Sequence, residues 1–328
     1  MNKHIRGKKI LTTCISIITM VWVTYRMWTF REWPAFSAFL RQNFSGLTEV
    51  LVLVFFLMFI NLGLETRRWQ LLVRQVASVP FSQALKQVIK GIQLGLITPA
   101  RTGDPLGKAA CFASKERPRV ILLSFAGSIL QNVVIFAFTL YAIALAGQTG
   151  DKYLDTISGY YSSIDSSIVI FSIIILILMI VLLWKIIAGN RVYAKITKAF
   201  KVFRYFTVAD ILYVGTLTLI RYLVFSLQFI ILLRFFGLPS TALGFIPVFL
   251  FYGAITFLPS LGAGDVGIRS AIALFIFGET AVSGPGIVLA TMFTWFFNIA
   301  LPAVTPALIQ PVRYSLTHLK SRYYRTPT

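Results

Sequence analysis

The sequence predicts an all-α polytopic membrane protein with six full transmembrane helices and two broken, re-entrant hairpins. Of its 328 residues, 57% are hydrophobic and only 13% are charged. Several apolar runs reach about 20 residues, the length that a helix needs to cross a bilayer. Two further apolar segments are interrupted by Pro and Gly, which break helices. The six uninterrupted runs lie at 10–29, 47–64, 120–146, 167–187, 211–236 and 286–309.

The basic residues cluster between the apolar runs and predict which ends of the helices face the cytoplasm. The formal net charge is +20, from 31 basic and 11 acidic residues. Positions 1–9 hold four Lys or Arg, 65–119 hold ten, 185–210 hold six and the residues after Gln310 hold four, whereas 148–165 hold one Lys and three Asp. Because Lys and Arg accumulate on the cytoplasmic side, we expect both termini there. Basic residues dispersed in this way fit a membrane surface, so we expect no nucleic-acid partner.

The two interrupted segments, at roughly 84–113 and 243–278, share one order of residues. The first segment contains Pro99, Gly103, Asp104 and Lys108, and the second contains Pro259, Gly262, Gly264, Asp265 and Arg269. Pro ends the incoming helix, Gly permits the reversal, and Asp suits the first turn of the outgoing helix, where it complements the helix dipole. Each segment therefore predicts a helix, a break and a second helix.

The charge pattern makes the first hairpin enter from the cytoplasm and the second from outside. Three spans and a hairpin then recur in opposite orientation, in halves of approximately 1–147 and 165–310. Such inverted repeats, with broken helices meeting near the midplane, are typical of transporters. We expect one membrane domain over 1–310 and a basic cytoplasmic tail over 311–328. The alternative is eight transmembrane helices, in which the second segment crosses twice.

Three motifs resemble those of the lysylphosphatidylglycerol synthase transmembrane family of flippase-like membrane proteins. They are R-R-W at Arg67–Trp69, T-P-A-R-T-G-D at Thr98–Asp104 and L-P-S-L-G-A-G-D-V-G-I-R at Leu258–Arg269. The chain departs from the family at Ser270, where members commonly carry Glu, and at Lys108, where many carry Arg. The resemblance implies movement of a polar lipid between leaflets, such as an aminoacylated phospholipid or a glycosylated carrier lipid. Members that also synthesise the lipid carry a soluble aminoacyl transferase domain after the membrane part. The sequence ends at Thr328 without one, so we expect no lysyl transfer to lipid. Because the 11 acidic residues are mostly isolated in loops and form no carboxylate cluster in the sequence, we expect no enzyme activity.

Each hairpin carries an aspartate and a cation four residues apart, which places both on one helix face and allows a local ion pair. The pairs are Asp104 with Lys108 and Asp265 with Arg269. One interpretation is that each aspartate caps its helix and the pair neutralises itself. The other is that the cation binds a lipid phosphate, while the aspartate positions it or meets a cationic headgroup. Arg101 is either a second phosphate contact or an interface charge.

Arg221 lies ten residues into the fifth apolar run, too deep to reach an interface comfortably. We expect it to line a polar path, with Gln228 on nearly the same helix face. Gln131, Asn132 and Asn298 either complete this path or hydrogen-bond between helices without a transport role. Glu65 pairs with Arg68 or sits in solvent, and Trp69 is predicted to be an interface anchor.

These features favour a lipid flippase or transporter that works by alternating access. The sequence has no G-x-x-x-x-G-K-[ST] loop, so we expect an ion gradient or downhill exchange to supply the energy, with Asp104 and Asp265 as the acids near the centre. The histidines, His4 and His318, lie in the polar tails, and we expect no metal or other cofactor. The expected partners are anionic or headgroup-modified lipids, a second copy of the chain or a lipid-synthesising enzyme, in a bacterial-type inner (plasma) membrane. The alternatives are a membrane enzyme for lipid-linked substrates and a scaffold subunit of an envelope assembly.

Overall fold

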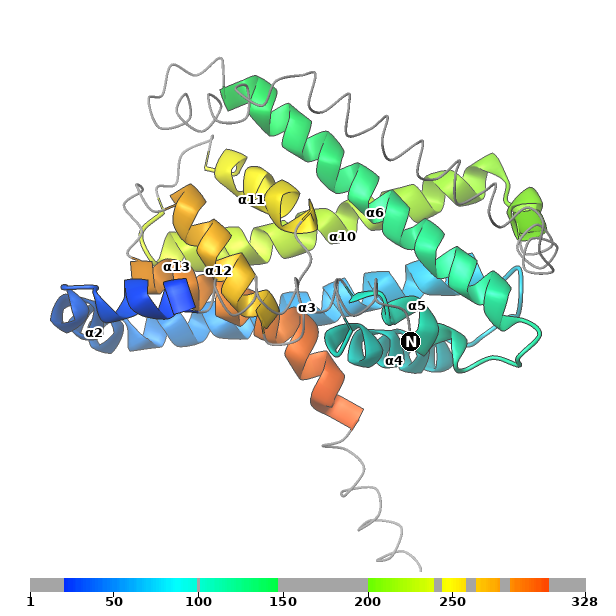
Figure 1. The fold of residues 1–328 in the computed structure, drawn as a ribbon, viewed down its shortest axis with the longest axis horizontal. Helices are drawn as coiled ribbons and strands as arrows, with labels where there is room; N and C mark the ends of the chain where they lie inside the picture. Colours follow the sequence, from blue (N-terminus) through cyan, green and yellow to red (C-terminus); the bar gives the residue numbers. More distant parts are fainter. Residues whose placement is uncertain are drawn as a thin grey trace, which may run out of the picture.

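The computed structural model describes residues 21–98, 101–146, 200–238, 244–257, 264–277 and 284–306. Within these ranges the regular elements are all helical, which confirms the predicted all-α class (Figure 1). Residues 21–28 are helical and belong to the predicted span 10–29. The rest of that span, the span 167–187 and the predicted hairpin residues Pro99, Pro259 and Gly262 lie outside the described ranges.

Four helical segments in the described ranges are long and apolar enough to cross a membrane. They are α3 (Phe44–Val73), α6 (Arg117–Ala146), α10 (Val208–Phe235) and the segment Gly284–Pro306, which begins as α13 (Gly284–Trp295). Their positions in the sequence confirm the predicted spans 47–64, 120–146, 211–236 and 286–309. The second span was predicted to end at position 64, but α3 continues through Glu65 to Val73 because its charged residues find partners inside the protein.

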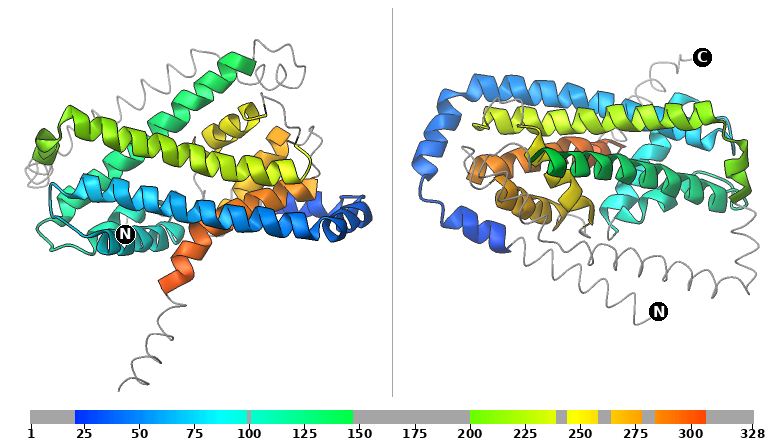
Figure 2. Two further views of the ribbon diagram at one scale, coloured as in Figure 1. Left: turned by 180° about the vertical axis from the view of Figure 1, so that it is seen from behind. Right: turned by 90° about the horizontal axis from the view of Figure 1, so that it is seen from above.

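The long helices form a bundle in which α3 and α10 lie side by side and run in opposite directions (Figures 1 and 2). A capping box starts α10: Thr207 Oγ1 accepts the Asp210 amide, and the Asp210 carboxylate accepts the Thr207 amide. Asp210 also pairs with Arg74, which ties the start of α10 to the end of α3.

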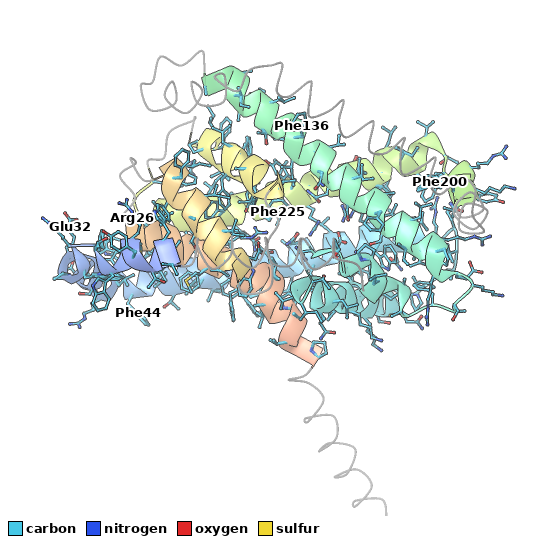
Figure 3. The ribbon with its side chains drawn as sticks, in the orientation of Figure 1. Arg26, Glu32, Phe44, Phe136, Phe200 and Phe225 are labelled. Atoms are coloured by element: carbon cyan, nitrogen blue, oxygen red, sulfur yellow. The ribbon has the colours of Figure 1, made fainter. Side chains whose placement is uncertain are left out.

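The outer faces of the bundle are apolar, whereas its interior holds an aromatic core. Phe44 and Phe136 are 68% and 47% exposed and point away from the bundle (Figure 3). Exposed apolar surface of this kind fits contact with lipid tails. Inside, Tyr222 of α10 is fully buried, with its ring centroid 4.9 Å from that of Phe138 of α6. The arrangement is that of an integral membrane protein.

The first predicted hairpin consists of α4 (Phe81–Leu96) and α5 (Asp104–Ala109). Gly103 was predicted to permit the reversal, but its φ of −77° is one that any residue adopts. Its role is close packing, because a Cβ there would lie 2.4 Å from the carbonyl oxygen of Leu94. The residue with a left-handed backbone is Arg101, at φ 55°.

The second predicted hairpin consists of α11 (Ile246–Phe257) and α12, which begins at Gly264 and ends at Phe277. Within the described ranges α11 and α12 hold 12 and 14 residues, and the choice between a re-entrant hairpin and two crossings remains a prediction. The shorter elements α2 (Trp33–Gln42), η2 (Lys201–Tyr205) and the π-helical η3 (Phe296–Ala300) complete the described fold.

The two hairpins lie at opposite ends of the long helices (Figure 1). The α4–α5 pair lies near the end where α10 begins, and the α11–α12 pair lies near the end where α3 begins. The order of span, hairpin and span therefore occurs twice in opposite directions, first as α3, α4–α5 and α6, then as α10, α11–α12 and α13. The boundaries of the two halves remain a prediction.

Candidate functional site

A cavity of about 500 Å³ lies inside the bundle, between the two hairpins. Four long helical segments each contribute a polar residue close to the middle of their length: Asn61 of α3, Gln131 of α6, Arg221 of α10 and Asn298 in η3. Arg101, Asp104 and Lys108 line it from the first hairpin, and Thr256 and Arg269 line it from the second. The cavity is therefore polar and charged at about half the depth of the bundle.

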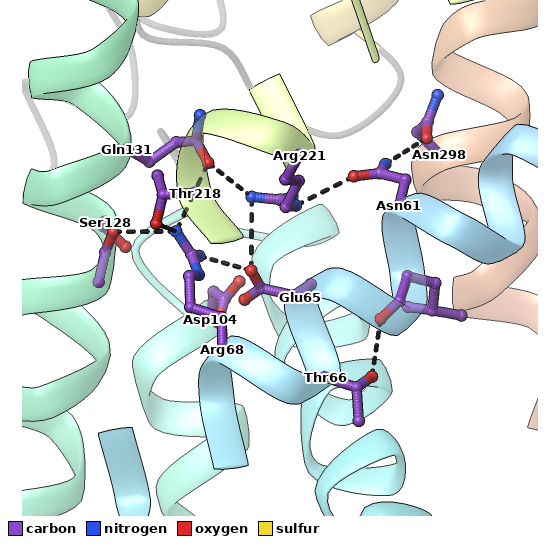
Figure 4. A network of polar contacts seen from close by, with 12 residues as sticks. Asn61, Glu65, Thr66, Arg68, Asp104, Ser128, Gln131, Thr218, Arg221 and Asn298 are labelled. Atoms are coloured by element: carbon purple, nitrogen blue, oxygen red, sulfur yellow. Dashed lines mark hydrogen bonds and ion pairs between the residues drawn. The ribbon is translucent and has the colours of Figure 1, made fainter. Parts of the chain in front are cut away.

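Glu65 of α3 is the centre of the charges in this cavity (Figure 4). Its Oε2 lies 2.5 Å from Arg68 Nη2 and 3.4 Å from Arg221 Nη1, and its Oε1 lies 3.0 Å from Lys108 Nζ. The predicted pairing with Arg68 is confirmed, and the solvent-exposed alternative is wrong because Glu65 is only 7% exposed. One carboxylate thus joins α3 to α5 and α10.

Arg68 and Trp69 connect α3 to the helices beside it. Arg68 Nη1 donates to the carbonyl oxygen of Gly127 at 3.2 Å and is buried. Trp69 is 1% exposed, and its Nε1 donates to Gln87 Oε1 of α4 at 2.7 Å. The prediction that Trp69 is an interface anchor is therefore wrong. Because α3 continues beyond Glu65, Trp69 is buried against α4 of the first hairpin. The Lys108 ammonium lies 5.1 Å from the Trp69 ring centroid.

Arg221 connects three helices through side-chain hydrogen bonds. Its Nε donates to Asn61 Oδ1 at 3.0 Å, and its Nη1 donates to Gln131 Oε1 at 2.9 Å. Asn61 in turn donates to Asn298, and Asn298 Nδ2 donates to Gln228 Oε1 at 2.9 Å. The structure brings together the predicted Arg221, Gln228, Gln131 and Asn298, and Asn132 also lines the cavity.

The structure adds a backbone feature at the predicted Asn298 and one residue, Asn61, that the sequence analysis missed. Asn298 lies in the π-helical turn η3, and π-helical turns often occur at functional sites. Asn61 was not predicted to be part of the site, although an amide in the apolar run 47–64 was a signal that could have found it.

The two predicted ion pairs of the hairpins are present. Lys108 Nζ lies 2.9 Å from Asp104 Oδ1, and Arg269 Nε lies 2.9 Å from Asp265 Oδ1. Asp104 lies in the first turn of α5, which confirms its predicted place at the start of the outgoing helix, and the N-cap residue is Gly103. The first pair does not only neutralise itself, because Lys108 also forms an ion pair with Glu65.

Arg101 differs from the other cations of the cavity. Within the described ranges it forms no ion pair with a carboxylate, and it is the one non-glycine residue there with a positive φ. A left-handed backbone costs roughly 1–2 kcal/mol for a residue with a Cβ, and strained residues of this kind cluster at functional sites. The break of the first hairpin therefore presents to the cavity a guanidinium that has no carboxylate partner among the described residues.

The fold and the charged cavity define a polytopic helical membrane protein with charged and polar residues in its interior. The family model of the lysylphosphatidylglycerol synthase transmembrane region matches residues 13–304. This match covers most of the 328 residues, and the chain belongs to this family. Searches of curated proteins and of solved structures found no match.

Proposed function

We propose that this protein moves a lipid with a polar headgroup between the leaflets of its membrane. The observation that carries the proposal is the charged cavity, which the two hairpins approach from opposite ends of the bundle. A charged residue at the centre of a transmembrane helix costs about 2.5–3.5 kcal/mol on insertion scales. A scaffold subunit has no need for so many such residues, whereas a transporter of polar headgroups does.

In this proposal the headgroup enters the cavity while the acyl chains remain in the surrounding hydrocarbon. Each hairpin closes the cavity toward one side, and the two open in turn, as in alternating access. The candidate lipids are an aminoacylated phospholipid and a glycosylated carrier lipid. The protein acts without hydrolysing ATP or performing covalent chemistry, so an ion gradient or downhill exchange drives transfer.

The proposed location is a bacterial-type inner membrane with both termini in the cytoplasm. The end of the bundle that holds α4, α5 and the start of α6 is rich in cations, including Arg74, Lys86, Lys115 and Arg117. This distribution supports a cytoplasmic orientation of that end. A second copy of the chain or an enzyme that makes the transported lipid is the proposed protein partner.

The Asp265–Arg269 pair provides the test of the proposed function. In proteoliposomes, transfer of a fluorescent lipid between leaflets is measured by quenching from outside, for the original protein and for the variants Asp265→Ala and Arg269→Ala. We expect transfer to fall to the rate of protein-free vesicles in both variants, because each loses one of the charges that the second hairpin places beside the cavity.

The matched control is Arg119→Ala, which also removes an arginine from an ion pair, the pair with Glu116 near the start of α6. Arg119 does not line the cavity, so this variant should retain transfer. Both second-hairpin variants must insert and purify like the original protein. Unchanged transfer in both of them would refute the proposed role of the pair.

A further inference from the structure

We infer that the cavity selects lipids with an anionic phosphate headgroup and disfavours headgroups of net positive charge. This inference deepens the proposed function, on which it rests, by naming the chemistry of the headgroup. Of the candidate lipids, an aminoacylated phosphatidylglycerol with a lysyl group carries a net positive charge, whereas a carrier lipid with a diphosphate group is anionic, as is unmodified phosphatidylglycerol.

The charges that line the cavity are predominantly positive. Among the described residues that line it, the cations are Arg68, Arg101, Lys108, Arg221 and Arg269, and the carboxylates are Glu65 and Asp104. When Asp265, the partner of Arg269, is counted with them, the described residues of the site still hold two more positive than negative charges. Uncompensated charge in a medium of low dielectric constant is costly, and a bound anion would relieve this cost.

The carboxylates of the site are already engaged with cations. Glu65 lies within 3.4 Å of Arg68, Lys108 and Arg221, and Asp104 lies 2.9 Å from Lys108. An ammonium group of an aminoacyl headgroup would have to displace a protein cation from one of these carboxylates. It would also meet the remaining cations of the cavity, which would repel it.

The guanidinium of Arg101 can donate hydrogen bonds to a phosphate group in the cavity. Arg101 has no carboxylate partner within the described ranges, and its planar guanidinium can donate two parallel hydrogen bonds to phosphate oxygens. Its Nε would lie 3.6 Å from a Cβ at Gly95, so the side chain lies along α4 at the inner end of the first hairpin. A cavity of about 500 Å³ falls in the range of about 300–1,000 Å³ found for small-ligand pockets, so it suits a headgroup.

The test measures binding separately from transport. The full-length protein in detergent is titrated with short-chain phosphatidylglycerol, phosphatidylcholine and lysyl-phosphatidylglycerol, and with glycerol phosphate as a soluble source of the same phosphate chemistry. We expect phosphatidylglycerol to bind roughly tenfold or more tightly than the other two lipids, because all three share the phosphate but the other two add a cationic group that the cations of the cavity repel. Glycerol phosphate should compete only weakly, because it has no acyl chains.

Arg101→Gln and Arg101→Lys separate the proposed contact from general effects on folding. Arg101 is partly exposed and holds no carboxylate among the described residues, so these variants should fold normally. We expect Arg101→Gln to weaken phosphatidylglycerol binding by roughly tenfold and Arg101→Lys to weaken it less, since Lys keeps the charge but loses the bidentate geometry. Arg67→Gln is the control, because Arg67 is exposed on the outer side of α3 and does not line the cavity.

The outcomes distinguish the inference from the proposed function. Equal binding of the three lipids, tighter binding of the lysyl lipid, or an Arg101→Gln variant with unchanged affinity would overturn the inference. Competition by glycerol phosphate as strong as that by the lipid would also overturn it, because the site would then recognise a soluble phosphate compound. Selective binding of phosphatidylglycerol without leaflet transfer of any lipid would support the inference and refute the proposed function.

Discussion

Replacement of Glu65 by Gln is expected to destabilise the folded protein by about 3–5 kcal/mol, the cost typical of breaking a buried ion pair by removing one partner. Gln has nearly the same shape, so the variant changes charge more than packing. Its amide leaves Arg68, Lys108 and Arg221 without the carboxylate they share, in an interior that excludes water. The loss should appear as a lower unfolding midpoint in a thermal or denaturant titration of the protein in detergent.

Glu116→Gln is the matched control for Glu65→Gln. Glu116 pairs with Arg119 at 3.1 Å, but both side chains are partly exposed, and such surface pairs are worth about 0–1 kcal/mol. A second variant, Glu65→Gln combined with Arg68→Met, removes a cation whose carboxylate partner among the described residues is Glu65. It should recover part of the lost stability. A Glu65→Gln protein as stable as the control would mean that Glu65 does not hold α3, α5 and α10 together.

Replacement of Gly107 by Ala is expected to destabilise the first hairpin by about 1–3 kcal/mol, the range typical of overpacking. The added Cβ would lie 2.4 Å from the carbonyl oxygen of Lys90 and 2.9 Å from the Cα of Gly91. These atoms belong to the backbone of α4, so a change of side-chain rotamer cannot relieve the clash. The expected readout is a lower thermal midpoint together with slower leaflet transfer, because α4 and α5 would be forced apart next to the cavity.

Gly63→Ala is the control for the hairpin variant, because a Cβ at Gly63 of α3 would meet no atom within 4 Å. Since Ala is favoured over Gly inside a helix by roughly 0.5–1 kcal/mol, this variant should match or exceed the stability of the original protein. If Gly107→Ala behaved like Gly63→Ala, the close contact between α4 and α5 would not contribute to stability.

Much of the fold could be predicted because apolar length and helix-breaking residues are local signals. The run at 211–236 agrees with α10 within three residues at each end, and the run at 120–146 begins within three residues of the start of α6. The prolines and glycines that interrupt two apolar segments predicted where both hairpins lie in the sequence. The second span was predicted too short for a physical reason: hydropathy falls at Glu65, although the helix continues because its charges are compensated by residues distant in sequence.

The candidate site was predicted in part. Arg221 was identified from its depth in an apolar run, and the pairs Asp104–Lys108 and Asp265–Arg269 were identified from helical spacing. The central role of Glu65 could not be predicted, because Lys108 and Arg221 approach it only when α5 and α10 pack against α3. For the same reason Trp69, which looks like an interface residue in sequence, is buried between α3 and α4.

The sequence by itself determined that this chain is a helical membrane protein with two broken segments and charges at unusual depth. Hydropathy, helical periodicity and the backbone limits of proline act over a few residues, so they can be read along the chain. Only the tertiary structure decided that these charges share one cavity, that Glu65 holds three cations and that Arg101 is left without a carboxylate within the described ranges. Electrostatic contacts depend on distance in space, and packing of helices far apart in the sequence sets that distance.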